Sequence, residues 1–147
     1  AAAGDEPIYN QYGLYDCDVC IITESWADTM SVYQSNKSVK IVHAIGLNGT
    51  GHKQLVEMLR RRPTQAKLVV ALDDDKAGWQ GAVRVGRELQ SIGANYGIWL
   101  CGFDARKDMN ELLQHDANVV PAFLDEMTNS VLLDADAAAE CYAGRYS

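Results

Sequence analysis

The stretch Lys67-Leu-Val-Val-Ala-Leu-Asp-Asp-Asp-Lys-Ala-Gly78 decides the fold class of this chain. Its first half is almost wholly apolar and rich in branched residues, which is typical of a parallel strand buried on both faces. Asp73, Asp74 and Asp75 follow at the carboxyl end of that strand. Adjacent carboxylates repel one another, and a bound divalent cation would turn this repulsion into coordination. The stretch therefore predicts a buried strand that ends in a candidate metal site.

Two further predicted strands also lead into acidic residues. The strand at 18–23 is followed by Glu24 and Asp28, and the strand at 96–101 is followed by Asp108. In a parallel sheet, ligands bind beyond the carboxyl ends of the strands. We therefore expect these acids to meet Asp73 and Asp75 at one edge of the sheet, as a metal site for phosphate chemistry.

Strand-like and helix-like segments alternate along the chain, which favours an α/β fold around a parallel sheet. Strands are predicted at 18–23, 39–45, 67–72 and 96–101, and helices at 26–35, 53–62, 77–91, 108–113 (the start of a short helix) and 119–127. This pattern divides the chain into an N-terminal extension at 1–17, a globular domain at 18–128 and a tail at 129–147. The tail shows no clear periodicity, so both a loose helix and a linker fit it.

Composition and charge exclude several classes of protein. The 147 residues are 48% hydrophobic and 22% charged, as in an ordinary globular domain. No apolar run is long enough to span a membrane, and residues 1–6 lack the features of a signal peptide, so we expect a cytoplasmic protein. The net charge of −7 argues against broad, charge-driven binding of nucleic acid by this segment alone.

The cysteines and one arginine run each allow two interpretations. Cys17 and Cys20 have the C-x-x-C spacing of zinc and redox sites, but no second pair follows, which favours buried, unreactive thiols. The run 60–62 consists of arginines at a predicted helix end, where they suit the helix dipole. A patch that contacts phosphate is the alternative.

Four segments of the chain stand in a characteristic order: Glu24-Ser-Trp-Ala-Asp28, Ala44-Ile-Gly46 with Thr50, Asp73-Asp-Asp-Lys-Ala-Gly78 and Lys107-Asp-Met-Asn-Glu-Leu-Leu113. They resemble the motifs of the Toprim domain of primases, topoisomerases, nucleases and recombination proteins. The primase branch is the closest in pattern, with Ser25 and Met109 replacing its usual glycine and proline. This departure suggests a divergent branch, such as the primases of plasmids or mobile elements.

The resemblance implies a Rossmann-like three-layer sandwich with a central, mainly parallel four-stranded sheet. It implies an enzyme that makes primers by nucleotidyl transfer on single-stranded DNA, using nucleotides, Mg²⁺ or Mn²⁺, and further domains of a longer polypeptide or a helicase. Glu24 would be a metal ligand or a general acid/base. The implied metal ligands are Asp73 and Asp75, with Asp28 assisting and Asp108 at a second metal, and the implied nucleotide contacts are Lys76 and Lys107.

Other interpretations of the same residues stay open. Asp75 and Asp108 each precede a predicted helix and are suited to cap it, and strand alternation turns Asp74 away from the metal. A nuclease of the same fold would use the same ion to activate water. A catalytically silent module that assembles on DNA is a further alternative. A topoisomerase would need a tyrosine that nothing here marks, and a phosphoacceptor receiver domain would carry its acidic pair after the first strand rather than the third.

Overall fold

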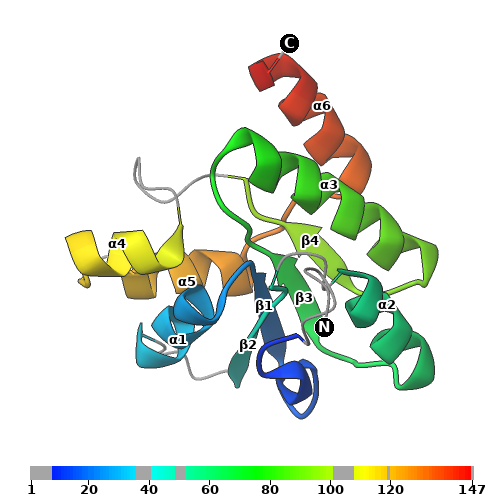
Figure 1. Ribbon diagram of the computed structural model, residues 1–147, viewed down its shortest axis with the longest axis horizontal. Helices are drawn as coiled ribbons and strands as arrows, with labels where there is room; N and C mark the ends of the chain where they lie inside the picture. The colour runs from blue at the N-terminus through cyan, green and yellow to red at the C-terminus, as the bar shows by residue number, and fades with distance from the viewer. Residues whose placement is uncertain (1–7, 36–40, 49–51, 101–107, 119, 147) are drawn as a thin grey trace.

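The computed structural model describes residues 8–35, 41–48, 52–100, 108–118 and 120–146. Helices and strands alternate along most of the chain, as Figure 1 shows. The elements are η1 (Gln11–Leu14), β1 (Val19–Thr23), α1 (Trp26–Ser35), β2 (Val42–Gly46), α2 (His52–Arg61), β3 (Lys67–Val70), α3 (Lys76–Ser91), β4 (Tyr96–Ile98), α4 (Met109–His115), α5 (Val120–Asn129) and α6 (Ala135–Tyr146).

The four strands form one sheet in the order β2-β1-β3-β4, and every pair of neighbours is parallel. Val19 at the start of β1 is paired with Val42 of β2 and with Lys67 of β3. All five residues of β1 are buried, as expected for an inner strand covered on both faces. The predicted α/β fold with a parallel four-stranded sheet is confirmed.

Helices cover both faces of the sheet, which gives three layers (Figure 1). Alternate residues of a strand point to opposite faces. Ile22 and Val70 therefore belong to the hydrophobic core under α2, α3 and α6, while Ile21 and Val69 belong to the core under α1, α4 and α5. The sheet edge that carries the acids lies where the strands pass into the loops before α1 and α3.

The longest described helix, α3, shows why the sequence pattern located it well. Ala82, Val85 and Leu89 recur at helical spacing and are buried against the sheet. Asp75 caps its start, and Gly93, with φ of 71°, follows its last turn in the left-handed conformation that glycine favours. None of the helices in the described ranges combines the length and the apolar composition needed to cross a membrane.

The two ends of the chain contribute more than their sequences suggest. Residues 8–17 of the predicted extension bring Ile8 and Leu14 into the hydrophobic core. In the tail, where a loose helix and a linker were both open, residues 135–146 form α6, which packs along α3. The predicted strands extend into 39–40 and to 101, which lie outside the described residues.

Candidate metal centre

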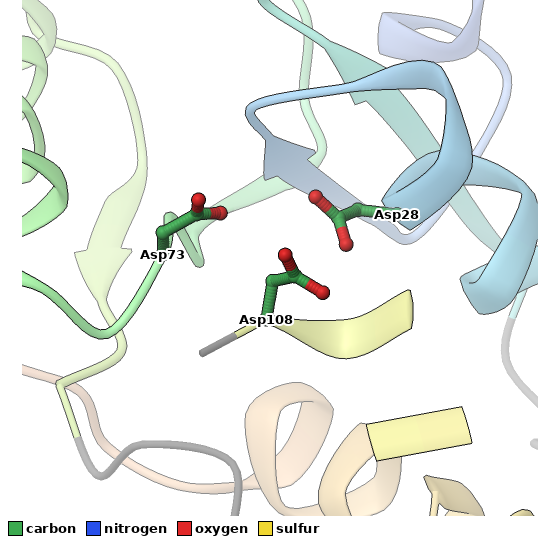
Figure 2. A group of neighbouring side chains, drawn as sticks. All are labelled: Asp28, Asp73 and Asp108. Atoms are coloured by element: carbon green, nitrogen blue, oxygen red, sulfur yellow. The ribbon is translucent and has the colours of Figure 1, made fainter. Parts of the chain in front are cut away.

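Three acidic side chains from distant parts of the chain converge at the carboxyl edge of the sheet. Asp28 lies in the first turn of α1, Asp73 in the loop after β3, and Asp108 directly before α4. One carboxylate oxygen from each lies within 4.8 Å of the others, and Figure 2 shows the three groups facing a common point. The sequence predicted this meeting because it placed all three acids after β-strands.

Asp28 is the most buried of the three, with 4% of its surface exposed. The Ser25 hydroxyl donates to Asp28 Oδ2 at 3.0 Å, and the Asn110 backbone N–H donates to Asp28 Oδ1 at 3.0 Å. Burial raises the pKa of Asp28 to about 6, and the charge of Asp108 raises it further, while the bonds from Asn110 and Ser25 oppose the shift. The carboxyl group therefore lacks the compensating charge that a cation would supply.

Asp73 is held in place through its backbone. Its N–H donates to Glu24 Oε1 at 3.4 Å, which joins the loops that follow β1 and β3. A Cβ on Gly78 would lie 2.0 Å from the Asp73 carbonyl oxygen. Only glycine allows α3 to begin this close to the loop, which is the physical reason for the glycine in the Asp73–Gly78 segment.

The three consecutive acids after β3 have three different roles. Asp73 lines the cavity beside Asp28, whereas the Asp74 carboxylate accepts a bond of 2.8 Å from Trp79 Nε1 and faces away, as strand alternation predicted. Asp75 Oδ1 accepts the Gly78 N–H at 2.7 Å and caps α3. Asp75 is outside the group of three converging carboxylates, so its role as a metal ligand stays a prediction.

Asp108 combines both of the roles considered for it. Its Oδ1 accepts the Glu111 N–H at 2.8 Å as the N-cap of α4, and its carboxylate also belongs to the converging group. Of the two lysines implied as nucleotide contacts, Lys76 is exposed at the start of α3, and Lys107 lies outside the described residues.

The converging acids line a cavity of about 480 Å³. Glu24 lies in the same wall, and Leu47 and Leu72 supply apolar surface. His52 and Arg84 also line the cavity, and neither was predicted as a site residue. Helical spacing was the available signal for Arg84, because Ala77, Gly81 and Arg84 recur at intervals of four and three residues on α3 and so share one face.

The donor set fits a hard divalent cation such as Mg²⁺ or Mn²⁺. All of the converging ligand atoms are carboxylate oxygens, which these ions prefer. An octahedral Mg²⁺ site with bonds of about 2.1 Å places its ligand oxygens about 3 to 4 Å apart, and small side-chain rotations would bring the acids to that spacing. Three carboxylates leave room for the waters or substrate oxygens that complete such a site.

The C-x-x-C pair is not part of this centre. Burial raises the pKa of the Cys17 thiol to about 11, and the charges of Asp18 and Asp16 add to the effect. Burial also raises the pKa of Cys20 well above its ordinary value. Both thiols therefore stay protonated near neutral pH, which agrees with the interpretation as unreactive thiols, since zinc binds the thiolate.

Comparison with known proteins agrees with the geometry. A family model described as Toprim-like matches residues 21–113 of the 147, and this range includes Glu24, Asp28, Asp73 and Asp108. No match was found among curated proteins. Since the matched range covers more than half of the chain and contains the whole acidic centre, the chain belongs to the Toprim-like family.

Proposed function

We propose that this chain is the metal-dependent catalytic domain of a primase-like enzyme, which joins nucleotides on a single-stranded nucleic-acid template. The convergence of Asp28, Asp73 and Asp108 is the observation that carries the proposal. Toprim domains bind divalent metals and occur in nucleotidyltransferases and nucleases. The primase branch is favoured by the order and spacing of the segments around Glu24, Asp73 and Asp108.

The acidic residues would hold the cation at the wall of the cavity. A bound Mg²⁺ or Mn²⁺ would polarise the α-phosphate of a nucleotide and offset the charge of the departing pyrophosphate. Asp28, Asp73 and Asp108 would be its ligands, with Asp75 as a further predicted ligand. Glu24 lines the same cavity and accepts the Asp73 N–H, which supports a role as a metal ligand or as a general acid/base.

Asp28 links cation binding to pH. Because its pKa is about 6 in the absence of a cation, it carries a proton in part of the population in mildly acidic solution. A ligand carboxylate must be deprotonated, so binding of the cation releases that proton. The affinity for the cation is therefore expected to rise between pH 5 and pH 7.

The cavity also offers a cationic group to a phosphate chain. Ala77 and Gly81 have little or no side chain, so this face of α3 leaves space between the acids and Arg84. Arg84 is exposed and makes no hydrogen bond or ion pair within the described part of the chain. A guanidinium group is well suited to phosphate oxygens. The phosphates of a nucleotide would thus lie between the cation and Arg84.

Most of the affinity for the template is expected to come from outside this segment. A net charge of −7 repels a polyanion unless cations intervene. We therefore propose that other domains of a longer polypeptide, or a helicase, hold the single-stranded DNA while this domain supplies the metal and nucleotide site.

A labelled single-stranded template incubated with nucleotides and Mn²⁺ tests the proposal in the full-length protein. We expect the unmodified protein to synthesise a strand complementary to the labelled template and the D73N/D108N variant to synthesise none. Shortening of the labelled strand would instead identify a nuclease that uses the same site. If neither reaction occurs although Mn²⁺ binds, the binding module is the better description, and if Mn²⁺ does not bind at all, the catalytic proposal fails.

A further inference from the structure

The middle acid of the triplet is held by the C-terminal helix. Asp74 Oδ1 accepts bonds from Trp79 Nε1 at 2.8 Å and from an Arg145 guanidinium nitrogen at 2.9 Å. The Asp74 side chain is only 15% exposed, so this ion pair is shielded from much of the solvent. Trp79 belongs to α3 and Arg145 to α6, and 71 residues separate Asp74 from Arg145 in the sequence.

Aromatic contacts fix the position of Arg145. Its guanidinium carbon lies 4.6 Å from the centre of the Trp79 ring and 5.4 Å from that of Tyr146. The Trp79 and Tyr146 rings meet edge to face, with their centres 5.8 Å apart. Because a planar guanidinium group both stacks on a ring and donates to a carboxylate, arginine satisfies the two demands at once. Figure 1 shows α6 lying beside α3, which brings its last turn to the acidic loop.

The loop of Asp73, Asp74 and Asp75 is therefore anchored at three points. The Asp73 N–H bonds to Glu24, and Asp75 caps α3. Asp74 supplies the third anchor, to which α3 contributes Trp79 and α6 contributes Arg145. Asp73 lines the cavity, whereas the adjacent Asp74 faces α6 from a bend in the same loop. Holding Asp74 toward α6 therefore restricts the backbone that directs Asp73 toward the cavity.

We propose that Arg145 is a positioning residue of the metal centre, acting through Asp74 on the direction of Asp73. The inference rests on the proposed function, because it assumes that Asp73 binds the cation. Displacing the last turn of α6 would then weaken cation binding although α6 contributes no ligand. This gives α6 a means of regulating the site, since any event that shifts the helix is transmitted to the acidic loop.

The direction in which the R145A variant changes the affinity for Mn²⁺ distinguishes a positioning role of Arg145 from a purely electrostatic effect. Removing Arg145 deletes a positive charge near the site, and Coulomb attraction alone would then strengthen the binding of Mn²⁺. Loss of positioning predicts the opposite, a decrease of about tenfold, which is at the low end of what outer-shell changes cost. The R145A variant therefore gives opposite signs under the two explanations.

The experiment is a calorimetric titration of the chain with Mn²⁺, accompanied by a thermal melt of each variant. The control is Y142F, which removes the acceptor of the 2.6 Å bond from Gln80 Nε2 between the same two helices without touching Asp74. We expect R145A and D74A to bind Mn²⁺ more weakly, Y142F to bind normally, and R145K to fall between R145A and the unmodified chain. The double variant D74A/R145A should bind no more weakly than D74A, because both residues act in one unit.

Two results would overturn the inference. Unchanged or tighter binding by folded R145A, with D73N still abolishing binding, would remove the role of Arg145 and leave the proposed metal centre intact. If the unmodified chain binds no Mn²⁺, the metal centre and the inference fail together. Should R145A not fold, R145K decides the question, because it retains the charge and loses only the planar stacking and donor geometry.

Discussion

Two cavities lie at opposite ends of β3, and the larger one is not the candidate site. The acidic cavity, of about 480 Å³, is formed by residues that follow β1 and β3. The other cavity, of about 620 Å³, is formed by residues 63–65 before β3 and 92–95 before β4, together with the end of α2. The acidic cavity receives four carboxylates, whereas the only charged side chain among the described residues that line the other cavity is that of Arg60.

The difference shows that convergent chemistry marks a site better than volume does. At the amino ends of the strands the neighbouring arginines are already engaged: Arg61 pairs with Glu57 at 3.0 Å, and Arg62 lies 3.9 Å from the centre of the Tyr15 ring. These contacts favour the structural interpretation of the arginine run. At the carboxyl ends, the buried Asp28 lies close to the half-buried Asp73 and Asp108, and a bound cation would offset the repulsion between these like charges.

The largest expected effect comes from neutralising the acidic end. D73N should weaken Mn²⁺ binding about a hundredfold or more, which exceeds the usual cost of outer-shell changes, because a direct ligand loses its charge. D16N is the matched control at the amino end of β1, where φ of 57° suits asparagine. Calorimetry with both variants checks the comparison, and equal losses would show that net charge rather than the site controls binding.

D28N should stabilise the protein in the absence of a cation. The Asp28 carboxyl titrates near 6 when folded, against 3.8 ordinarily, so the folded state holds the extra proton between these values. Ionisation of the buried Asp28 carboxyl group destabilises the folded state. This destabilisation is absent below about pH 4, grows as the pH rises, and is complete above about pH 6. At about 1.4 kcal/mol per pKa unit, the shift from 3.8 to about 6 corresponds to a gain of about 3 kcal/mol in the free energy of unfolding for D28N at pH 7.5.

Chemical unfolding at pH 4 and pH 7.5, with and without Mn²⁺, measures this difference. The gain should vanish at pH 4 and reverse with saturating Mn²⁺, since only the unmodified protein is stabilised by the ion. D16N should show neither trend. A gain that is the same at both pH values would contradict the assigned cause.

The Arg84 side chain tests whether the acidic cavity, rather than the other cavity, binds the phosphates of a nucleotide. R84A should weaken the binding of a nucleoside triphosphate about tenfold in the presence of Mn²⁺, the size of effect expected when a charge-assisted contact to phosphate is lost. Binding of Mn²⁺ alone should not weaken. R87A, on the same helix but outside the acidic cavity, and R60A, in the other cavity, are the controls. Equal losses in all three variants would indicate general attraction rather than a phosphate contact.

The smallest expected effect separates the two roles of Asp75. As a helix cap, D75A should cost about 1 kcal/mol of stability and D75N almost nothing, because asparagine caps equally well. As a metal ligand, both variants should weaken Mn²⁺ binding, although less than D73N. Thermal melts and calorimetry on the pair give the answer, and a full loss of binding in D75N with normal stability would place Asp75 in the metal site.

The sequence predicted the sheet and the edge where the acids meet, because β1 and β3 are mostly buried and apolar and acidic residues follow each of them. Strand alternation also predicted that Asp74 faces away from the cavity. It did not separate Asp73 from Asp75, because only the start of α3 shows which of the two lines the cavity and which caps the helix. The hydrogen bond from the Asn110 N–H to Asp28 joins residues that are 82 positions apart, so no local sequence pattern could predict it.

The choice between a helix and a linker at the C-terminal end, where α6 forms, stayed open for a different reason. The buried contacts of α6 come from small residues, Ala135 and Ala138, and its remaining contacts come from aromatic rings and Arg145. Hydrophobic periodicity registers large apolar side chains, so a helix that packs through alanine shows little of it. The sequence analysis therefore did not foresee a contribution of this helix to the site.

Both outer strands of the sheet carry a short antiparallel bridge. Tyr9 pairs with Gly46 of β2, and Leu133 pairs with Ile98 of β4. An exposed edge strand has unpaired backbone groups with which a strand of another chain can pair, and this leads to aggregation. In this protein, the segments around Tyr9 and Leu133 pair with part of the two edge strands. The same flanking segments that look dispensable in the sequence thus protect the domain from sheet-to-sheet association at high local concentration.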